Sequence, residues 1–210
     1  MYLPRHFAED DPASLRALMG AFPLAAIVRH GSDGLAADHV PLSYDPASRT
    51  LRGHVARANP LWREGASPGG LAVLAIFRAE QAYVSPNWYP AKARTHQAVP
   101  TWNYAVVHAH GRLQAVDDAG WLRAFLGQLT ARHEATQPQP WELDDAPADY
   151  LERMLRAVVG IEISVERLVG KLKLSQNRDA ADQAGVLDGL AAQGTPDALA
   201  MAARLRARSG

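Results

Sequence analysis

Short segments in which apolar and polar residues alternate occupy much of this chain, and they constrain its fold more than any other feature. They cover residues 24–30, 34–44, 50–57, 71–86, 101–116 and 160–176. A period of two is typical of strands with one buried face, and turn-forming stretches such as Gly31–Gly34 and Asp45–Ser48 separate the first three. Helices do not alternate regularly with these segments, so we expect six or seven antiparallel strands and no βαβ units.

Helical patterns lie between and after the strands. Asp11 and Pro12 are suited to the start of a short helix, and further helices are expected near residues 59–65, 119–133 and 147–158. The fold class predicted is therefore mainly β with helices (α+β), an antiparallel barrel with helices at its ends, because closure removes exposed strand edges.

From Asn177 onward the chain is rich in alanine and predicts a pair of helices. We expect residues 1–176 to form the barrel domain and residues 177–210 a helical hairpin packed on the barrel or on a second subunit. A helix-turn-helix is the alternative, but its recognition helix would present Pro196, Asp197, Ala198 and Leu199, which are poor readers of base edges. The formal net charge of +0 also gives autonomous DNA binding no support.

The residue types present limit the chemistry of any site. There is no cysteine, which excludes disulfides, thiolate nucleophiles and cysteine-ligated metals. Walker A, GxGxxG and HExxH patterns are also missing from the sequence, so a phosphate site would have to be built from side chains and strand ends. His108 and His110 share a strand face and could chelate a metal, but core or exposed histidines are the commoner case and we predict no metal site.

Three stretches concentrate polar and aromatic residues at strand ends: 53–62, 83–92 and 98–111. They supply cations suited to a phosphate (Arg57, Lys92), hydroxyls (Ser85, Thr101), amides (Asn59, Asn103) and flat apolar walls (Trp88, Trp102). A phosphorylated planar heterocycle would need this set of groups. Packing or turn-forming roles are the alternative for each residue taken singly.

Several motifs together resemble one known family, the PaiB-like FMN-binding negative transcriptional regulators, which have a split-barrel flavin-binding fold. The motifs are MYLPRHF, HVPL, GHVARANPLW, YVSPNWY with Lys92, VPTWNYAVVHAHG, and KLSQNR followed by GVLDGL. The resemblance covers nearly the whole chain. It implies a six-stranded Greek-key barrel, a homodimer and noncovalently bound FMN near the subunit interface.

By motif position, the resemblance makes ten residues candidate FMN contacts. They are Arg57, Asn59, Ser85, Lys92, Thr101, Trp102, Asn103, Lys173, Gln176 and Asn177. Chemistry favours Arg57, Ser85 and Lys92 for the phosphate and Trp102 for the ring.

The expected function is that of an FMN-binding negative transcriptional regulator that senses through its flavin and acts on DNA or on another regulatory protein. An FMN-dependent oxidoreductase of the split-barrel type is the alternative, because one fold serves many functions. A haem-binding protein that uses His108 or His110 is a more distant one. The chain has an acidic start, and its longest apolar run, Leu71–Phe77, is too short to span a bilayer. We therefore expect a cytoplasmic protein without a membrane partner.

Overall fold

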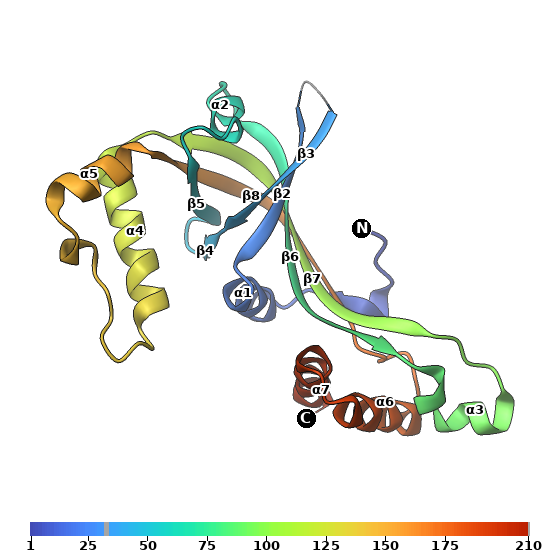
Figure 1. Ribbon diagram of the computed structural model, residues 1–210. Helices are drawn as coiled ribbons and strands as arrows, with labels where there is room; N and C mark the ends of the chain where they lie inside the picture. Colours follow the sequence, from blue (N-terminus) through green and yellow to red (C-terminus); the bar gives the residue numbers. More distant parts are fainter. Residues whose placement is uncertain (32–33, 210) are drawn as a thin grey trace. The chain divides into compact units, whose positions relative to one another are not determined.

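An eight-stranded sheet forms the framework of the protein (Figure 1), as seen in a computed structural model that describes residues 1–31 and 34–209. Its strands are β1 (Ala8–Glu9), β2 (Leu24–Gly31), β3 (Gly34–Pro41), β4 (Ser43–Asp45), β5 (Thr50–Ala56), β6 (Leu71–Val84), β7 (Thr101–Val116) and β8 (Val158–Lys173). Hydrogen bonds connect them in the order β3-β2-β6-β7-β8-β5-β4, and β1 pairs with β8. The β2–β3, β2–β6, β4–β5, β5–β8 and β1–β8 pairs are antiparallel, as the alternating segments predicted. The centre of the predicted turn at 31–34 lies outside the described residues.

The predicted fold class, mainly β with helices (α+β), is confirmed, while two details of the expected six-stranded barrel differ. The sheet has eight strands, and among the described residues its hydrogen-bonded path runs from β3 to β4 without closing. These two end strands come from one predicted segment, which is interrupted between Pro41 and Ser43. Proline has no N–H to continue a ladder, and the Leu42 N–H donates to the carbonyl of Pro23 at 2.9 Å. The two ends of the sheet are thus joined through the chain.

Seven α-helices accompany the sheet in the described part of the chain. They are α1 (Pro12–Ala21), α2 (Leu61–Gly65), α3 (Pro90–Thr95), α4 (Ala119–Glu134), α5 (Ala148–Arg156), α6 (Ala180–Gln193) and α7 (Pro196–Ser209), with short 3-10 turns η1 (Arg5–Phe7), η2 (Pro86–Trp88) and η3 (Leu143–Asp145). Asp118 and Asp179 cap the N-termini of α4 and α6 by accepting from the N–H groups of Trp121 and Asp182. The helices predicted from capping residues and apolar spacing are confirmed. In the described residues, none is long and apolar enough to cross a bilayer.

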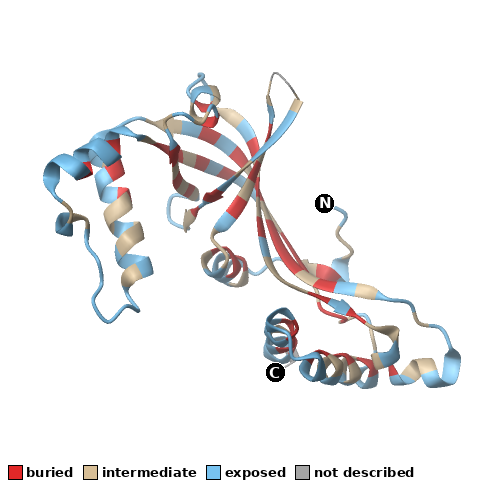
Figure 2. Ribbon diagram, in the orientation of Figure 1, coloured by how far each residue is buried: buried red, intermediate tan, exposed pale blue. Residues whose placement is uncertain are grey.

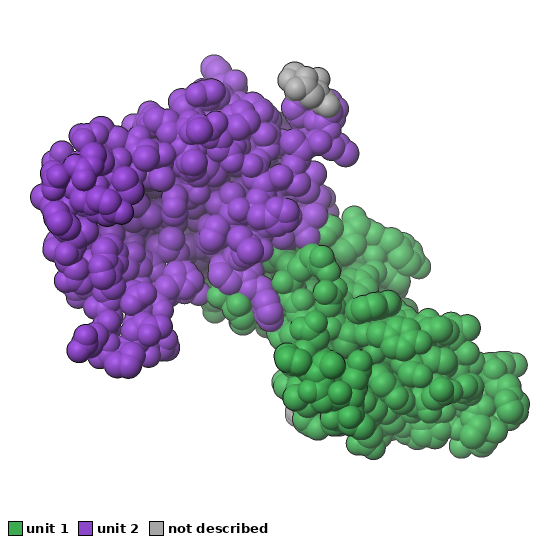
Figure 3. Space-filling model, in the orientation of Figure 1, with its two compact units in different colours: residues 1–21, 77–108, 169–210 green, residues 22–76, 109–168 purple. Residues whose placement is uncertain are grey.

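The chain divides into two compact units (Figure 3). Unit 1 contains residues 1–21, 77–108 and 169–210, and unit 2 contains residues 22–76 and 109–168. Strands β6, β7 and β8 each contribute residues to both. The sequence predicted a domain boundary at residue 177, and that boundary stays a prediction.

In unit 2 the core is formed by inward-facing aliphatic residues of the strands, visible as red bands in Figure 2. Ile27, Leu51, Ile161 and Ile163 are fully buried, at 0% exposure. A second, smaller cluster joins Leu122, Leu151 and Leu155 of α4 and α5.

In unit 1, helices α6 and α7 bury Val186, Leu190 and Met201. Helix α6 approaches η2 so closely that a Cβ at Gly189 would lie 2.2 Å from Trp88 Cδ2. The Ala91 N–H also donates to the Asp182 carboxylate at 3.0 Å. Helix α6, the first of the terminal pair, therefore packs against the segment that connects β6 to β7.

Candidate functional site

The end of β8 and the start of β7 bring Lys173 and Thr101 together within unit 1, although 72 positions separate them in the sequence. The Lys173 ammonium group donates to the Thr101 hydroxyl and to the carbonyl of Trp102, the latter at 2.9 Å. Burial lowers the pKa of Lys173 from its ordinary value, and the neighbouring positive charges of Lys171 and Arg178 lower it further. The amine is therefore held where its positive charge is poorly compensated.

Lys173 belongs to a group of three cations that we call the Lys173 cluster: Lys171, Lys173 and Arg178. Lys171 is 7% exposed and lies over the Tyr104 ring at 5.4 Å, while the Arg178 guanidinium lies 4.5 Å from the Tyr89 ring centroid. Among the residues that the structure describes, none of the three forms an ion pair with a carboxylate. An anionic ligand would relieve the mutual repulsion of these charges.

The buried side-chain amide of Asn103 lies next to this region and stabilises it. Asn103 is 0% exposed, and its side chain exchanges hydrogen bonds with the Ser175 hydroxyl at 3.0 and 3.2 Å. Gln176 accepts from the Leu174 N–H at 2.6 Å and donates to the Leu172 carbonyl. Asn103 and Gln176 are thus placed beside the Lys173 cluster, and their polar groups hold the turn after β8. Asn177, the third candidate of this motif, is exposed.

The alternation predicted for β7 holds except at Val106, which is also buried, and it places the aromatic residues on the more exposed face. Asn103, Ala105, Val107 and Ala109 are buried, whereas the Trp102 side chain is 53% exposed. The Trp102 and Tyr83 rings meet edge to face, with centroids 6.2 Å apart. The strand therefore presents an aromatic surface next to Thr101.

Ser85 and Lys92 converge on a third residue within unit 1. The Ser85 hydroxyl accepts from the Asn87 N–H at 3.2 Å, and the Lys92 ammonium group donates to the Asn87 side-chain oxygen. Ser85 therefore caps η2. Lys92 is linked to the same turn, and among the described residues it has no carboxylate partner.

The other two candidates, Arg57 and Asn59, lie in unit 2 and make extensive contacts there. The Arg57 guanidinium forms two hydrogen bonds with Asp117, at 2.8 and 2.6 Å, and donates to the Arg156 carbonyl at 2.7 Å. Asn59 donates to Asp38 at 2.7 Å and accepts from the Leu61 N–H at 2.8 Å, which fixes the start of α2. These contacts give both residues a structural role, and their contact with FMN stays a prediction.

Sequence reasoning missed two features. Lys171, on β8, and Tyr89, between η2 and α3, became relevant only in the structure, where they lie beside the predicted residues. The Tyr89 hydroxyl is buried without a hydrogen-bond partner among the described residues. In unit 2, Arg29 is 6% exposed and forms ion pairs with Asp38 and with Glu64. An arginine directly after the apolar run of β2 was the available signal for these ion pairs.

In the described part of the chain, no three His, Asp or Glu side chains are grouped as metal ligands. Burial lowers the pKa of His54, and burial together with Arg167 lowers that of His110.

Comparison with known proteins defines the class: the chain belongs to the family described as "Putative FMN-binding domain", whose model matches residues 1–167. FMN, the cofactor predicted from the sequence, is the ligand of that family. Among individual proteins, the chain is 29% identical to protease synthase and sporulation protein PAI 2 of Bacillus subtilis over 204 residues, 96% of this chain and 95% of the relative. An uncharacterized protein of Aspergillus fumigatus is 33% identical over 189 residues, 76% of this chain and 72% of the relative.

A solved structure confirms the fold. The FAD and heme binding protein from Mycobacterium smegmatis superimposes with a TM-score of 0.62 at 16% identity, covering 90% of this chain and 80% of that one. At this identity the similarity concerns the fold, which is that of flavin-binding split-barrel proteins with an α+β composition. The family match ends at residue 167, so it covers the strands of unit 2 and none of the three residues of the Lys173 cluster.

The residues of unit 1 fit an FMN molecule chemically. Cations without carboxylate partners match a phosphate, and the Thr101 hydroxyl adds a neutral donor. The exposed Trp102 and Tyr83 rings match a planar aromatic system.

Proposed function

We propose that this protein is an FMN-binding negative transcriptional regulator in which the flavin serves as a sensor. The observation that carries the proposal is the similarity to PAI 2 over nearly the full length of both chains. The name of that relative, protease synthase and sporulation protein PAI 2, connects it with sporulation. A regulatory role for the chain is consistent with such a relative, and the FMN-binding family supplies the cofactor.

The Lys173 cluster would hold the FMN phosphate in this proposal. Lys173 is already directed by Thr101 and the Trp102 carbonyl, so little side-chain freedom would be lost when the phosphate binds. Trp102 would contact the ring and shield one side of it from water. FMN would supply one- and two-electron redox chemistry, and the protein would supply binding, orientation and the local electric field.

A homodimer in the cytoplasm is part of the proposal, with DNA or a second regulatory protein as the target. Contacts within unit 1 favour the protein target. Arg204 pairs with Glu80 at 2.5 and 2.8 Å, and Arg208 lies 3.5 Å from Glu9, so two arginines of α7 already have carboxylate partners. Phosphate contacts by these two arginines would require those pairs to break.

Visible absorption of the purified full-length protein tests the proposal. Wild-type protein should bind FMN stoichiometrically, and the bound flavin should stay oxidised during minutes of incubation with NADH or NADPH. Rapid bleaching with repeated turnover would instead assign an FMN-dependent oxidoreductase. Failure to bind FMN would overturn the sensor.

A further inference from the structure

A small cavity opens within unit 2 between α4 and the β4–β5 hairpin, and we call it the α4–β4 cavity. Its volume is about 310 Å³, and its lining includes Ser43, Arg52, Phe125, Leu129 and Arg132. This volume lies at the lower end of the range of about 300–1,000 Å³ that small-molecule sites occupy. None of the ten predicted FMN contacts lines it.

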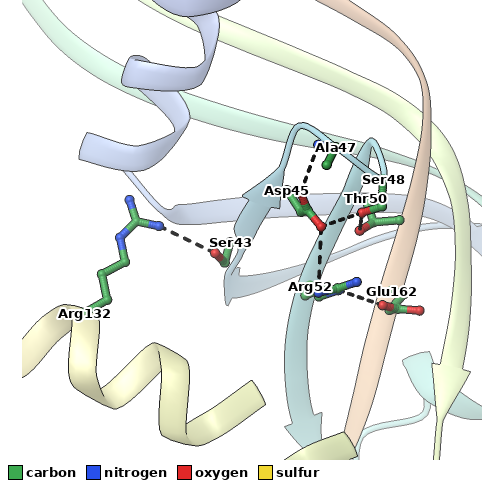
Figure 4. Close-up of polar contacts among 8 residues, drawn as sticks. All are labelled: Ser43, Asp45, Ala47, Ser48, Thr50, Arg52, Arg132 and Glu162. Atoms are coloured by element: carbon green, nitrogen blue, oxygen red, sulfur yellow. Dashed lines mark hydrogen bonds and ion pairs between the residues drawn. The ribbon is translucent and has the colours of Figure 1, made fainter. Parts of the chain in front are cut away.

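One face of α4 supplies the helical side of the cavity. Phe125, Gln128, Leu129 and Arg132 recur at the spacing of successive helical turns and so share that face. Phe125 is 6% exposed and forms an apolar floor together with Leu129. Arg132 projects from the end of this row toward the Ser43 side chain, as Figure 4 shows. The cavity thus has an apolar part and a cationic part.

The positive charge of Arg52 is already compensated. Arg52 donates to Glu162 at 2.8 Å and lies 3.9 Å from Asp45 (Figure 4). Asp45 itself accepts from the Ser48 hydroxyl at 2.8 Å and from the Ala47 N–H at 2.9 Å, and these hydrogen bonds lower its pKa. The hairpin therefore keeps Asp45 ionised and directed toward Arg52.

Arg132 differs from Arg52 because it has no carboxylate partner among the described residues. Its single polar contact there is a 3.5 Å approach to the Ser43 hydroxyl, at the outer limit of a hydrogen bond. A guanidinium has five N–H donors in a planar fork that matches a carboxylate, and the Ser43 hydroxyl adds a sixth donor nearby.

We propose that the α4–β4 cavity binds a small organic monocarboxylate, with its carboxylate on Arg132 and Ser43 and its apolar part against Phe125 and Leu129. The charge balance favours a monoanion. One uncompensated cation faces the cavity, while the carboxylate of Asp45 in its wall would repel the second charge of a phosphate monoester. The site is separate from the proposed flavin function, so either can fail without the other.

Titration of the full-length protein with defined probes tests this proposal. Benzoate and hexanoate are the carboxylate probes, benzamide and hexanamide are their neutral counterparts, and inorganic phosphate is the polyanion control. Binding is followed by two-dimensional NMR of backbone amides at constant ionic strength. The carboxylates should produce saturable chemical-shift changes at Ser43 and in α4. They should bind at least ten times more tightly than the amides or phosphate.

Variants of two arginines on α4 separate a specific contact from the loss of one positive charge. Arg132→Gln should weaken carboxylate binding at least tenfold, and Ser43→Ala should weaken it about threefold. Arg123→Gln is the matched control: Arg123 is also exposed on α4 but pairs with Asp144, so binding should stay within twofold of wild type. Both arginine variants should bind FMN as the wild type does.

Three results would overturn the proposal: amides that bind as well as their acids, equal effects of Arg132→Gln and Arg123→Gln, or no saturable carboxylate binding at millimolar concentrations. A fourth result, tighter binding of phosphate than of either carboxylate, would assign the cavity to phosphorylated ligands and would also reject the proposal.

Discussion

The proposed flavin site depends most on a single amine. Lys173 is partly buried, faces two other cations and already donates to two oxygen atoms. A lysine with a lowered pKa and no carboxylate partner among the described residues gains more from a bound anion than a fully solvated lysine does. Its surroundings therefore make a stronger argument for the phosphate than residue type alone.

Lys173→Gln should reduce FMN affinity by tenfold or more. Glutamine keeps a hydrogen-bond donor but removes the charge, and hydrogen bonds to charged groups contribute about 1.5–3 kcal/mol. Quenching of FMN fluorescence on titration measures the change.

The same titration decides between Lys173 and the two cations that the sequence favoured. If Lys92→Ala or Arg57→Ala lowers FMN affinity and Lys173→Gln does not, the phosphate lies elsewhere. Arg123→Gln, which removes an exposed charge in unit 2, should leave the affinity unchanged.

His54 should make the stability of the protein depend on pH. Burial lowers its pKa in the folded protein, so the unfolded chain binds the proton more readily. The free energy of unfolding should therefore fall as pH decreases through the ordinary histidine pKa of about 6.5 toward the lower pKa of the folded state. Urea unfolding between about pH 5 and 7.5 measures this slope.

His54→Gln should reduce that slope, because the titrating group is gone. His133→Gln is the control, since His133 is exposed on α4. If the two variants have the same slope as wild type, burial of His54 does not contribute to acid sensitivity.

At the scale of elements, two glycines allow helix α6 to lie close to η2. A Cβ at Gly189 would overlap the Trp88 ring, and one at Gly185 would lie 2.0 Å from the Trp88 carbonyl oxygen. Helix α6 can lie on η2 at this distance only because both positions lack side chains.

Gly189→Ala should lower the free energy of unfolding by about 1–3 kcal/mol, because overpacking costs more than the helix propensity that alanine adds. Gly127→Ala in α4 is the matched control: its Cβ would meet Leu143 at an ordinary 3.6 Å, so its stability should be unchanged or higher. Thermal unfolding of both variants measures the difference. Equal stability would show that α6 does not pack on Trp88 in solution.

The sequence predicted most elements because local signals mark them. Asp118 and Asp179 mark helix starts, and alternation marks the long strands. Sheet closure could not be predicted in this way, since it depends on how β3 and β4 separate at Leu42. The site could be predicted only in part, because Thr101 and Lys173 come together through long-range strand pairing. Motif positions identified Lys173, whereas Lys171 carries no local signal of its surroundings.

At the scale of the whole molecule, the terminal helices act as structural parts of unit 1. They bury apolar residues, cover Trp88 and pair Arg204 with Glu80. Because of this packing, removal of α6 and α7 should destabilise the protein.

A chain ending at Asp179 should have a lower thermal unfolding midpoint and weaker FMN binding than the full-length protein. Size-exclusion chromatography with light scattering, together with FMN titration, checks this. A shortened chain that stays folded, keeps its oligomeric state and FMN affinity, and loses only salt-sensitive DNA association would contradict the packing role and assign α6 and α7 to DNA.

Unit 1 is assembled from three separate pieces of chain, the last of which starts at Val169. During synthesis on a ribosome, the first 21 residues leave the exit tunnel long before their partners exist; Ala8, for example, pairs with Lys171. Unit 2 has all of its residues once Leu168 has emerged. The nascent chain can therefore complete unit 2 first, and the Lys173 cluster becomes available for an anion only after Arg178 has emerged.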